Sequence, residues 1–547
     1  MKIVSAREMN AVEQEVMRSG TSENILIANA AKSISNIVKT RLGSVIGKNI
    51  LVLAGPGNNG KDALASSLIL AKWGANITVH IAGNDQSSNI FAESIQSSGN
   101  IVVSSQKIFL DFLDTIENST EQYLLLDGLF GTGYQKRPQS IMSQLTSKLN
   151  KSTGKNNASI QVLAIDIPSG MNSDDGSGDE DILKADFTVA IGAIKKGLLT
   201  SQGLEKCGKI IVAPIGIPEE SFPISSPEVL ELSKVSKMLS LRPLDGHKGT
   251  FGKASIIGGS PTYIGAPFMA ARSAIRSGAG LVSLVTPGNL GAETAEYLPE
   301  AIHESLPTNP SNKSFDQVSA NAFLERDFNN ATLIGPGIGL AKYTVEFVHQ
   351  IIKSSGKKGT ASRSKQIVID ADGITAISSL KEWWDQNNNI SVITPHPGEM
   401  ATLSNIPTES IQQNRLDTVY EKSLQWGVVV VLKGALTAVG NPYGDISVNP
   451  LAWPGLASAG TGDVLSGLIT GLLAQGHEPY SAAQIGVYTH GISSILAAEH
   501  LAAEDRGILA TDVADNIPKA INIMLSGKME KYLVNQLTIV TESVYLS

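Results

Sequence analysis

The sequence LVLAGPGNNGKDALASS, residues 51–67, decides the fold of the first part of the chain. Its apolar start, residues 51–54, predicts a buried strand, and its alanine-rich end predicts a helix. Backbone amides between such a strand and helix can hold a phosphate group. The glycines satisfy the dinucleotide fingerprint GxGxxG and most of the P-loop pattern GxxxxGKS/T, which fails only at Asp62.

Three interpretations of this loop stay open at this point. A P-loop needs a neutral hydroxyl where Asp62 stands, because a carboxylate there would repel the phosphates that the loop binds. A dinucleotide-binding Rossmann fold needs an acidic residue about 20 residues further on, and the sequence offers only Asp85, which comes late. A tight turn that binds no ligand is the third interpretation.

Length and composition exclude several classes of protein. A chain of 547 residues is too long for one hydrophobic core and predicts two large α/β domains or roughly three to four smaller ones. A formal net charge of −8 argues against a nucleic-acid partner, and the single cysteine, Cys207, excludes an internal disulfide and a cysteine-ligated zinc site. Acidic residues interrupt the first 20 positions and no apolar run reaches membrane length, so we expect a cytoplasmic protein without a membrane partner.

Short apolar strands alternate with helical segments along most of the chain, which predicts α/β domains built on mostly parallel sheets. In the first half the expected strands are residues 51–54, 77–81, 123–126, 162–165, 187–191 and 210–213. The pattern lapses in the proline-rich stretch 214–227 and then resumes. We therefore expect two domains, residues 1–222 and residues 223–547.

Polar side chains follow successive strands of the first half. Asp127 ends the strand in LLLDGLFGTG, and Asp166 and Ser169 follow the strand in LAIDIPSG. Because parallel strands of a doubly wound sheet end at one edge, we expect these side chains to share a crevice with Asn58, Asn59 and Asp62. Oxygen ligands without histidine or cysteine suit a hard cation rather than zinc. The alternative for each aspartate is a helix cap without catalytic function.

GPGNNGxD, LDGLFGTG and AIDIPSG, in this order and spacing, resemble the epimerase domain of the NAD(P)H-hydrate repair enzymes. The resemblance implies a Rossmann-like three-layer αβα domain in which Asp166 contacts the substrate and is the best candidate for acid–base work. It also implies a potassium site lined by Asn59, Asp127 and Ser169. The residues that it assigns to the hydrated dinucleotide are Asn58, Asn59, Gly60, Lys61, Asp62, Gly131, Thr132, Gly133, Tyr134, Gln135, Lys136 and Arg137.

One position departs from the pattern of this family. The family usually has Gly-Gly-Asp-Gly where this chain has Lys61 and Ala63 in place of the second and fourth residues. Lys61 either supplies a cation for the diphosphate of the ligand or narrows the pocket.

The strongest signal of the second half is ASAGTGDVLSG, residues 457–467. Its glycines predict a tight turn into a helix whose free amides stabilise developing phosphate charge, and Asp463 can take a proton from a substrate hydroxyl. In TPHPGEM, residues 394–400, Glu399 is a candidate to hold a Mg²⁺-bound water. The alternative for Asp463 is the N-cap of a buried helix.

HKGTFG, GPGIG, TPHPGE, KGALT and AGTGD occur in this order and resemble the ribokinase-like αβα fold, specifically its ADP-dependent NAD(P)H-hydrate dehydratase branch. The resemblance makes Asp463 the expected base. The residues that it assigns to the hydrated nicotinamide nucleotide are Ala266, Gly339, His396 and Asp463. The residues that it assigns to the adenine nucleotide are Lys433, Gly434, Ala435, Leu436, Thr437, Gly460, Thr461 and Gly462.

Together the two resemblances imply a bifunctional metabolite-repair enzyme, an isomerase and a lyase in one chain. The first domain is expected to interconvert the R and S forms of NADH or NADPH hydrated at C6. The second is expected to dehydrate the S form with ADP, giving NAD(P)H, AMP and phosphate. The expected cofactors are K⁺ in the first domain and Mg²⁺ in the second, and we expect a homo-oligomer. The alternative is a ribokinase-like kinase of a small alcohol, fused to a non-catalytic dinucleotide-binding domain.

Overall fold

The computed structural model describes residues 1–82, 100–104, 106–116, 121–133, 146, 148–150, 160–178, 182–288, 290, 295–309, 313–325, 330–355, 366–385, 389–503, 505–529 and 531–546. Four residues expected to bind substrate, Tyr134, Gln135, Lys136 and Arg137, lie outside these ranges. Within the described ranges, no helix combines the length and the apolar character that crossing a membrane requires.

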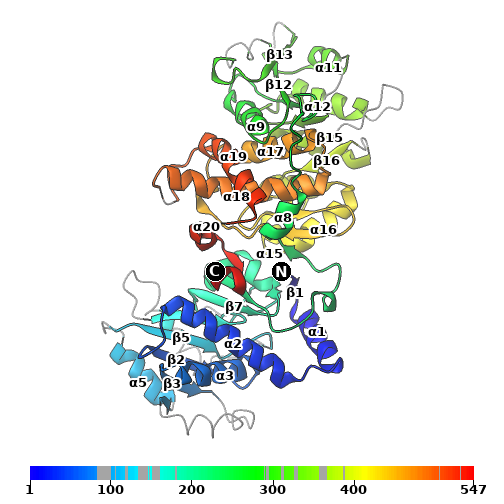
Figure 1. The fold of residues 1–547 in the computed structure, drawn as a ribbon. Coiled ribbons are helices and arrows are strands. Elements are labelled where there is room, and N and C mark those ends of the chain that lie inside the picture. The colour runs from blue at the N-terminus through cyan, green and yellow to red at the C-terminus, as the bar shows by residue number, and fades with distance from the viewer. Residues whose placement is uncertain are drawn as a thin grey trace. The chain divides into compact units, whose positions relative to one another are not determined.

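The chain forms two compact units (Figure 1). The first comprises Met1–Ser226 and Leu537–Ser547, and the second comprises Pro227–Gln536. Each unit is built on a mostly parallel sheet with helices packed against it, so the α/β fold class predicted from the sequence is confirmed.

The first unit contains an eight-stranded sheet in which every neighbouring pair is parallel, in the order β20-β9-β7-β6-β5-β2-β3-β4. Its strands are β2 (Asn49–Ala54), β3 (Asn76–Ile81), β4 (Ile101–Ser104), β5 (Tyr123–Gly128), β6 (Ile160–Ile165), β7 (Phe187–Ile191), β9 (Lys209–Ala213) and β20 (Ile539–Thr541). A separate parallel pair joins β1 (Ile3–Val4) to β8 (Ile194–Lys195). All six strands expected in this half are present, and their bounds lie within two residues of the predicted ones.

The helices of the first unit begin where the sequence offers caps and apolar faces. Ser5 caps α1, because its hydroxyl accepts from the Glu8 amide at 3.2 Å while the Glu8 carboxylate accepts from the Ser5 amide at 2.7 Å. Helices α2 and α3 lie side by side on the sheet (Figure 1). The described helices of this unit are α1 (Ala6–Arg18), α2 (Glu23–Leu42), α3 (Asn58–Lys72), α5 (Gln106–Ile116), η2 (Lys196–Leu199), α7 (Ser201–Cys207), η3 (Glu219–Ser221) and α21 (Glu542–Leu546).

The order of the strands reverses between β2 and β5. The chain runs from β2 outward through β3 and β4, then returns to β5 on the other side of β2 and continues outward in the opposite direction. The loops that follow β2 and β5 therefore diverge and leave a crevice at the carboxyl edge of the sheet. The glycine loop 55–57, the start of α3 and Asp127 in β5 all lie at this point.

The end of the chain returns to the first unit. Strand β20 pairs in parallel with β9, with Ile539 opposite Ile210, and α21 packs against α2 and β9. The second domain expected from the sequence, residues 223–547, therefore extends too far, because residues 537–547 complete the sheet of the first unit. A three-residue strand has too little periodicity of its own to predict a partner so distant in the sequence.

The second unit contains a ten-stranded sheet in the order β10-β19-β18-β17-β16-β15-β14-β11-β12-β13, antiparallel only where β18 pairs with β17 and β19. Its strands are β10 (Glu228–Val229), β11 (Lys253–Ile257), β12 (Leu281–Pro287), β13 (Ile302–Leu306), β14 (Ala331–Ile334), β15 (Gln366–Ile369), β16 (Ile390–Ile393), β17 (Val429–Leu432), β18 (Ala438–Gly440) and β19 (Ile446–Val448). The order reverses between β11 and β14, so a second crevice forms at the carboxyl ends of those strands.

Helices cover both faces of this second sheet. On one face an apolar core joins the strands to helices α11 to α16, and on the other α17 packs against α9, β14 and β15. The described helices of this unit are α8 (Leu232–Met238), α9 (Gly265–Arg276), η4 (Ala295–Tyr297), α11 (Gln317–Leu324), α12 (Lys342–Ser355), α13 (Asp372–Ser378), η5 (Trp383–Asp385), α14 (Pro397–Ser404), α15 (Thr408–Gln413), α16 (Arg415–Trp426), η6 (Pro454–Leu456), α17 (Thr461–Ala474), α18 (Pro479–His500), α19 (Ala510–Ser526) and α20 (Lys531–Gln536).

Candidate active sites

In the first unit, Asp127 and Ser169 lie in contact at the ends of β5 and β6. The Ser169 hydroxyl donates to Asp127 Oδ1 at 2.5 Å, and the Ser169 amide donates to Oδ2 at 2.8 Å. Asp127 is completely buried, and burial raises the pKa of its carboxyl to about 6, although hydrogen bonds from Ser169 and Leu129 lower it in part. A buried carboxylate whose charge is only partly offset favours a cation nearby.

Asn59, in the first turn of α3, joins the loops that follow β5 and β6. Its side-chain amide donates to the carbonyl of Ile165 at 2.6 Å and to that of Phe130 at 3.1 Å. Gly131 lies directly against this side chain, since a Cβ at position 131 would stand 2.4 Å from Asn59 Oδ1. Only glycine therefore allows the loop to approach Asn59 so closely.

Asp166 follows β6 and forms a buried ion pair that the sequence did not indicate. Its partner is Lys195 of β8, whose ammonium donates to Asp166 Oδ1. The Ile191 amide donates to the same oxygen at 3.0 Å. The backbone of Asp166 has a φ of 69°, a left-handed conformation that is rare for a residue other than glycine and that is often found at functional sites.

Asp62 and Glu13 add two more carboxyl groups to the electrostatic surroundings of Asp166. Burial raises the pKa of Asp62 well above its ordinary value, and the charges of Asp166 and Glu13 raise it further. Burial also raises the pKa of Glu13, which Lys195 lowers in part. The first unit therefore places two carboxyl groups that tend to keep their protons near one that is paired with an ammonium, an arrangement suited to exchanging a proton with a substrate.

Most of the substrate-binding residues predicted for the first unit lie around this crevice, within the described chain. Asn58, Asn59 and Gly60 begin α3, and residues 131–133 follow β5. The ammonium of Lys61 is paired with another protein residue, since it lies 2.7 Å from the Glu23 carboxylate of α2. The charge that distinguishes this chain from the family pattern is thus paired within the protein.

In the second unit, helix α17 begins at the site that the sequence predicted. Gly460 is its N-cap with a φ of 90°, and a Cβ there would stand 2.4 Å from the Cε atom of Met269. The Thr461 amide donates to the carbonyl of Ser458 at 3.4 Å, and the amides of Gly462 and Asp463 form the free part of the first turn, which favours an anion such as a phosphate group. Asp463 thus lies inside the helix rather than at its N-cap.

Asp463 belongs to a group of charged side chains around Lys433. The Lys433 ammonium lies 2.7 Å from Asp370 Oδ1 and 3.7 Å from Glu399 Oε2. The pKa of Asp463 is raised to about 7, mainly by burial and also by the negative charges of Asp370, Glu399 and Asp372. The positive charge of Lys433 lowers it in part. Burial and the charge of Asp370 also raise the pKa of Glu399, and Lys433 again opposes them. A carboxyl that titrates near neutral pH is well suited to act as a general base.

His396 and Glu399 form the capping box of α14. His396 Nδ1 accepts from the amides of Gly398 and Glu399, at 3.0 and 3.2 Å, while Glu399 Oε2 accepts from the His396 amide at 2.7 Å. More than half of the His396 side chain is exposed, so its outer edge can still contact a ligand. In the neighbouring loop the Gly339 amide donates to Asp372 Oδ2 at 3.0 Å.

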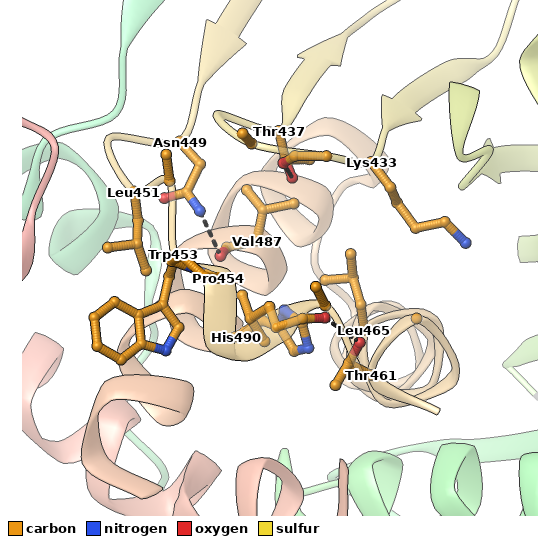
Figure 2. A pocket seen from close by; sticks show the side chains of 16 residues that line it. Lys433, Thr437, Asn449, Leu451, Trp453, Pro454, Thr461, Leu465, Val487 and His490 are labelled. Atoms are coloured by element: carbon orange, nitrogen blue, oxygen red, sulfur yellow. Dashed lines mark hydrogen bonds between the residues drawn. The ribbon is translucent and has the colours of Figure 1, made fainter. Parts of the chain in front are cut away.

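A cavity of about 350 Å³ lies beside the start of α17 (Figure 2). Lys433 lies at one side of it and Trp453 at the other, with His490 between Trp453 and Thr461. Among the predicted nucleotide-binding residues, its lining includes Lys433, Gly434, Ala435, Thr437, Thr461 and Gly462. Leu436 is buried and Gly460 is absent from the lining. One end of the cavity is therefore cationic and rich in backbone amides, and the other is apolar.

Sequence reasoning missed several residues of both sites. Lys195 and Glu13 come from elements remote from the glycine loops, and Asn449, Trp453 and His490 line the cavity from beyond the motifs. The Nε2 atom of His490 and the Nε1 atom of Trp453 are buried without a hydrogen-bond partner in the described structure. The sequence GAIKKG carries no local signal for Lys195, because only the structure shows that this lysine is buried and paired.

Two family models match the chain in tandem. One described as YjeF-related protein N-terminus matches residues 23–197, and one described as NAD(P)H-hydrate dehydratase matches residues 254–519. The bifunctional NAD(P)H-hydrate repair enzyme of Coxiella burnetii is 31% identical, with 94% of this chain and 98% of that protein covered. The corresponding enzyme of Moorella thermoacetica is 30% identical, with 95% and 96% covered. A solved ADP/ATP-dependent NAD(P)H-hydrate dehydratase from Bacillus subtilis is 26% identical and covers 55% of this chain and 99% of its own, with a TM-score of 0.47. The chain therefore belongs to the family of bifunctional NAD(P)H-hydrate repair enzymes.

Proposed function

We propose that this chain repairs hydrated NADH and NADPH, with epimerisation at C6 in the first unit and ADP-dependent dehydration of the S form in the second. The observation that carries the proposal is the same in both units. An aspartate, buried in the case of Asp166 and partly buried in the case of Asp463, lies beside glycine-rich loops at the carboxyl edge of a parallel sheet. The amides of these loops can hold phosphate groups. Membership of the family supports this assignment of the two activities.

In the second unit Asp463 takes the proton of the C6 hydroxyl, and the oxygen attacks the β-phosphoryl group of ADP, which releases AMP. The amides at the start of α17 stabilise the charge that develops on the transferred phosphoryl group. The phosphorylated hydrate then loses phosphate from C6 and a proton from C5, which restores the dihydronicotinamide ring. Phosphate leaves far more readily than hydroxide, so the phosphorylation drives the dehydration.

The cavity is the proposed site for the adenine nucleotide. Its cationic end, formed by Lys433 and the amide of Gly462, suits the phosphates, and its apolar end at Trp453 suits the base. The size of the cavity falls in the range of small-molecule sites. ADP is the proposed phosphoryl donor.

The residues near Lys433 fit a Mg²⁺ ion that is bound together with a nucleotide. Asp370 Oδ2 is buried and has no hydrogen-bond partner in the described structure, and Glu399 Oε2 lies 3.7 Å from the same Lys433 ammonium. In the described chain no group of three or more histidine, cysteine or acidic side chains could hold a metal alone. Mg²⁺ typically takes one or two carboxylates and completes its shell with phosphates and water, and it would neutralise charge on the transferred phosphoryl group.

The buried oxygens of the first unit fit a potassium ion. Asn59 Oδ1 accepts no hydrogen bond from any described residue, and the Asp127 carboxyl is completely buried beside Ser169. A monovalent cation there would offset the charge of Asp127 and fix the loop that carries Gly131. Cytoplasmic localisation and homo-oligomerisation remain predictions.

The test is to mix both epimers of hydrated NADH with the purified chain, ADP and Mg²⁺, and to follow the absorbance of reduced nicotinamide. We expect both epimers to be consumed. Asp463→Asn should abolish recovery of NADH from the S form, and Asp166→Ala should stop consumption of the R form while S is still dehydrated, so each variant is the control for the other.

Three outcomes would contradict the proposal. Near-normal turnover by Asp463→Asn would show that Asp463 is not the base of the dehydration. Rapid consumption of both epimers by Asp166→Ala would show that Asp166 is not required for epimerisation. A stable phosphorylated product in place of NADH, AMP and phosphate would favour the small-alcohol kinase instead.

A further inference from the structure

Lys195 is one of the most deeply buried charged residues of the described chain, with 1% of its surface exposed. Its ammonium donates to the Asp166 carboxylate, to the carbonyl of Ile191 at 2.8 Å and to that of Ala193 at 3.1 Å. A lysine ammonium carries three protons, and all three are used within the protein. Lys195 therefore has no donor left for a substrate, and any function in catalysis must act through Asp166.

Asp166 is held asymmetrically. Oδ1 accepts from both the Lys195 ammonium and the Ile191 amide, whereas no described residue donates a hydrogen bond to Oδ2. The backbone amide of Asp166 donates to the carbonyl of Val189 at 2.8 Å, which ties its left-handed backbone to strand β7. One carboxylate oxygen is thus fixed by the protein and the other is left for a ligand.

We propose that Lys195 is the positioning residue of the epimerase site: it fixes Asp166 through Oδ1 so that Oδ2 exchanges a proton with the C6 hydroxyl of the hydrated nicotinamide. This inference rests on the proposed epimerase function. Loss of this proton lets the C6–N1 bond break, which gives an aldehyde at C6 and leaves the electron pair on N1, conjugated with the ring carboxamide. N1 then adds to the other face of the aldehyde, and Oδ2 returns the proton to the oxygen, so C6 is inverted and no other reactant is consumed.

The same lysine also ties Asp166 to the turn between β7 and β8. Ile191 ends β7 and Ala193 lies just before β8, so the three bonds of Lys195 connect the carboxylate to both sides of this turn. A purely structural lysine would affect stability alone. A positioning lysine also changes the rate of proton transfer and its pH dependence, and those quantities separate the two possibilities.

The experiment compares Lys195→Met and Lys195→Arg in the full-length chain, with Lys184→Met as the matched control at an exposed lysine of the same unit. For Lys195→Met we expect kcat for conversion of R to S to fall by about 10²-fold or more, the range that general acid–base catalysis contributes. KM should change less than about threefold, and the acid limb of the kcat profile should move to higher pH. Lys195→Arg should recover part of kcat. Dehydration of the S form by the same preparation should be unchanged.

Lys195→Arg covers the case in which Lys195→Met alone unfolds the first unit, because arginine keeps the positive charge beside Asp166 but changes the donor geometry. Its kcat for conversion of R to S should lie below that of the unmodified chain, with KM within about threefold. Retention of kcat within about threefold of the unmodified chain by Lys195→Met or, where that variant does not fold, by Lys195→Arg would overturn the inference. A chain that does not epimerise before any substitution would instead overturn the proposed function, and this inference with it.

Discussion

The pH dependence of dehydration follows from the surroundings of Asp463. Burial and the charges of Asp370, Glu399 and Asp372 raise the pKa of its carboxyl from 3.8 to about 7, although Lys433 opposes them. A rise of about three units corresponds to roughly 4 kcal/mol of preference for the protonated form. The proposed base must be deprotonated to act, so kcat/KM should increase as the pH rises through 7.

The expected effect is large enough to exclude an ordinary aspartate. With a pKa of about 7, about nine-tenths of Asp463 is ionised at pH 8 and about one-hundredth at pH 5, so kcat/KM should fall roughly 90-fold between these values. An aspartate with an ordinary pKa would remain more than about 90% ionised at pH 5. The assay is the recovery of reduced-nicotinamide absorbance from the S hydrate, at saturating ADP, a low fixed concentration of Mg²⁺ and low hydrate concentration.

Two controls accompany this measurement. Enzyme held at pH 5 and returned to pH 8 should regain its full rate, which excludes denaturation. Additional Mg²⁺ should move the acid limb to lower pH, because a divalent cation near Asp370 and Glu399 would favour the ionised form of Asp463. A kcat/KM that stays constant down to pH 5 would refute the assignment of Asp463 as a base with a raised pKa.

Three further predictions test buried or tightly packed groups. The pKa of Asp62 is higher in the folded first unit than in the unfolded chain, so the stability of this unit should fall as pH rises above the ordinary carboxyl range. Asp62→Asn should therefore raise the Tm of the first unit at pH 8 but hardly at pH 4. Equal changes in Tm at the two pH values would contradict this. Gly131→Ala should displace the Asn59 side chain from a position 2.4 Å away and lower the epimerase kcat/KM by up to about 10²-fold, with dehydration as the unaffected control. Lys433→Met should leave Asp370 buried and unpaired and destabilise the second unit by about 3–5 kcal/mol in denaturant unfolding, a loss that Lys433→Met/Asp370→Asn should largely reverse.

Local signals in the sequence were sufficient for the central strands and the glycine loops. Strands buried on both faces are continuous apolar runs, so β2, β5 and β6 could be located within two residues. Strand ends carry the chemistry in such folds, which is why Asp127, Asp166 and Ser169 could be expected at one crevice. The structure places the Ser169 hydroxyl on Asp127 and the Asn59 amide on Ile165, at the end of the same strand that precedes Asp166.

The features that could not be predicted depend on contacts between distant segments. Strands β1, β8 and β20 have two or three residues each, and their pairing is set by tertiary contacts rather than by periodicity. Lys195 acquires its role only because the turn after β7 brings it to Asp166. Trp453 and His490 come to one cavity from η6's N-cap and from α18, and neither residue belongs to one of the glycine-rich motifs.

The return of the chain to strand β9 has a consequence for how this protein can be made and divided. In the sequence, the whole dehydratase unit lies between strand β9 of the epimerase sheet and strand β20, which pairs with β9. The ribosome must therefore synthesise almost the entire polypeptide before β20 can pair with β9. Until then β9 exposes unpaired backbone groups of the kind that recruit other chains. A gene split at the apparent domain boundary would yield an N-terminal half with that edge permanently open, whereas a split that donates residues 537–547 to it would not.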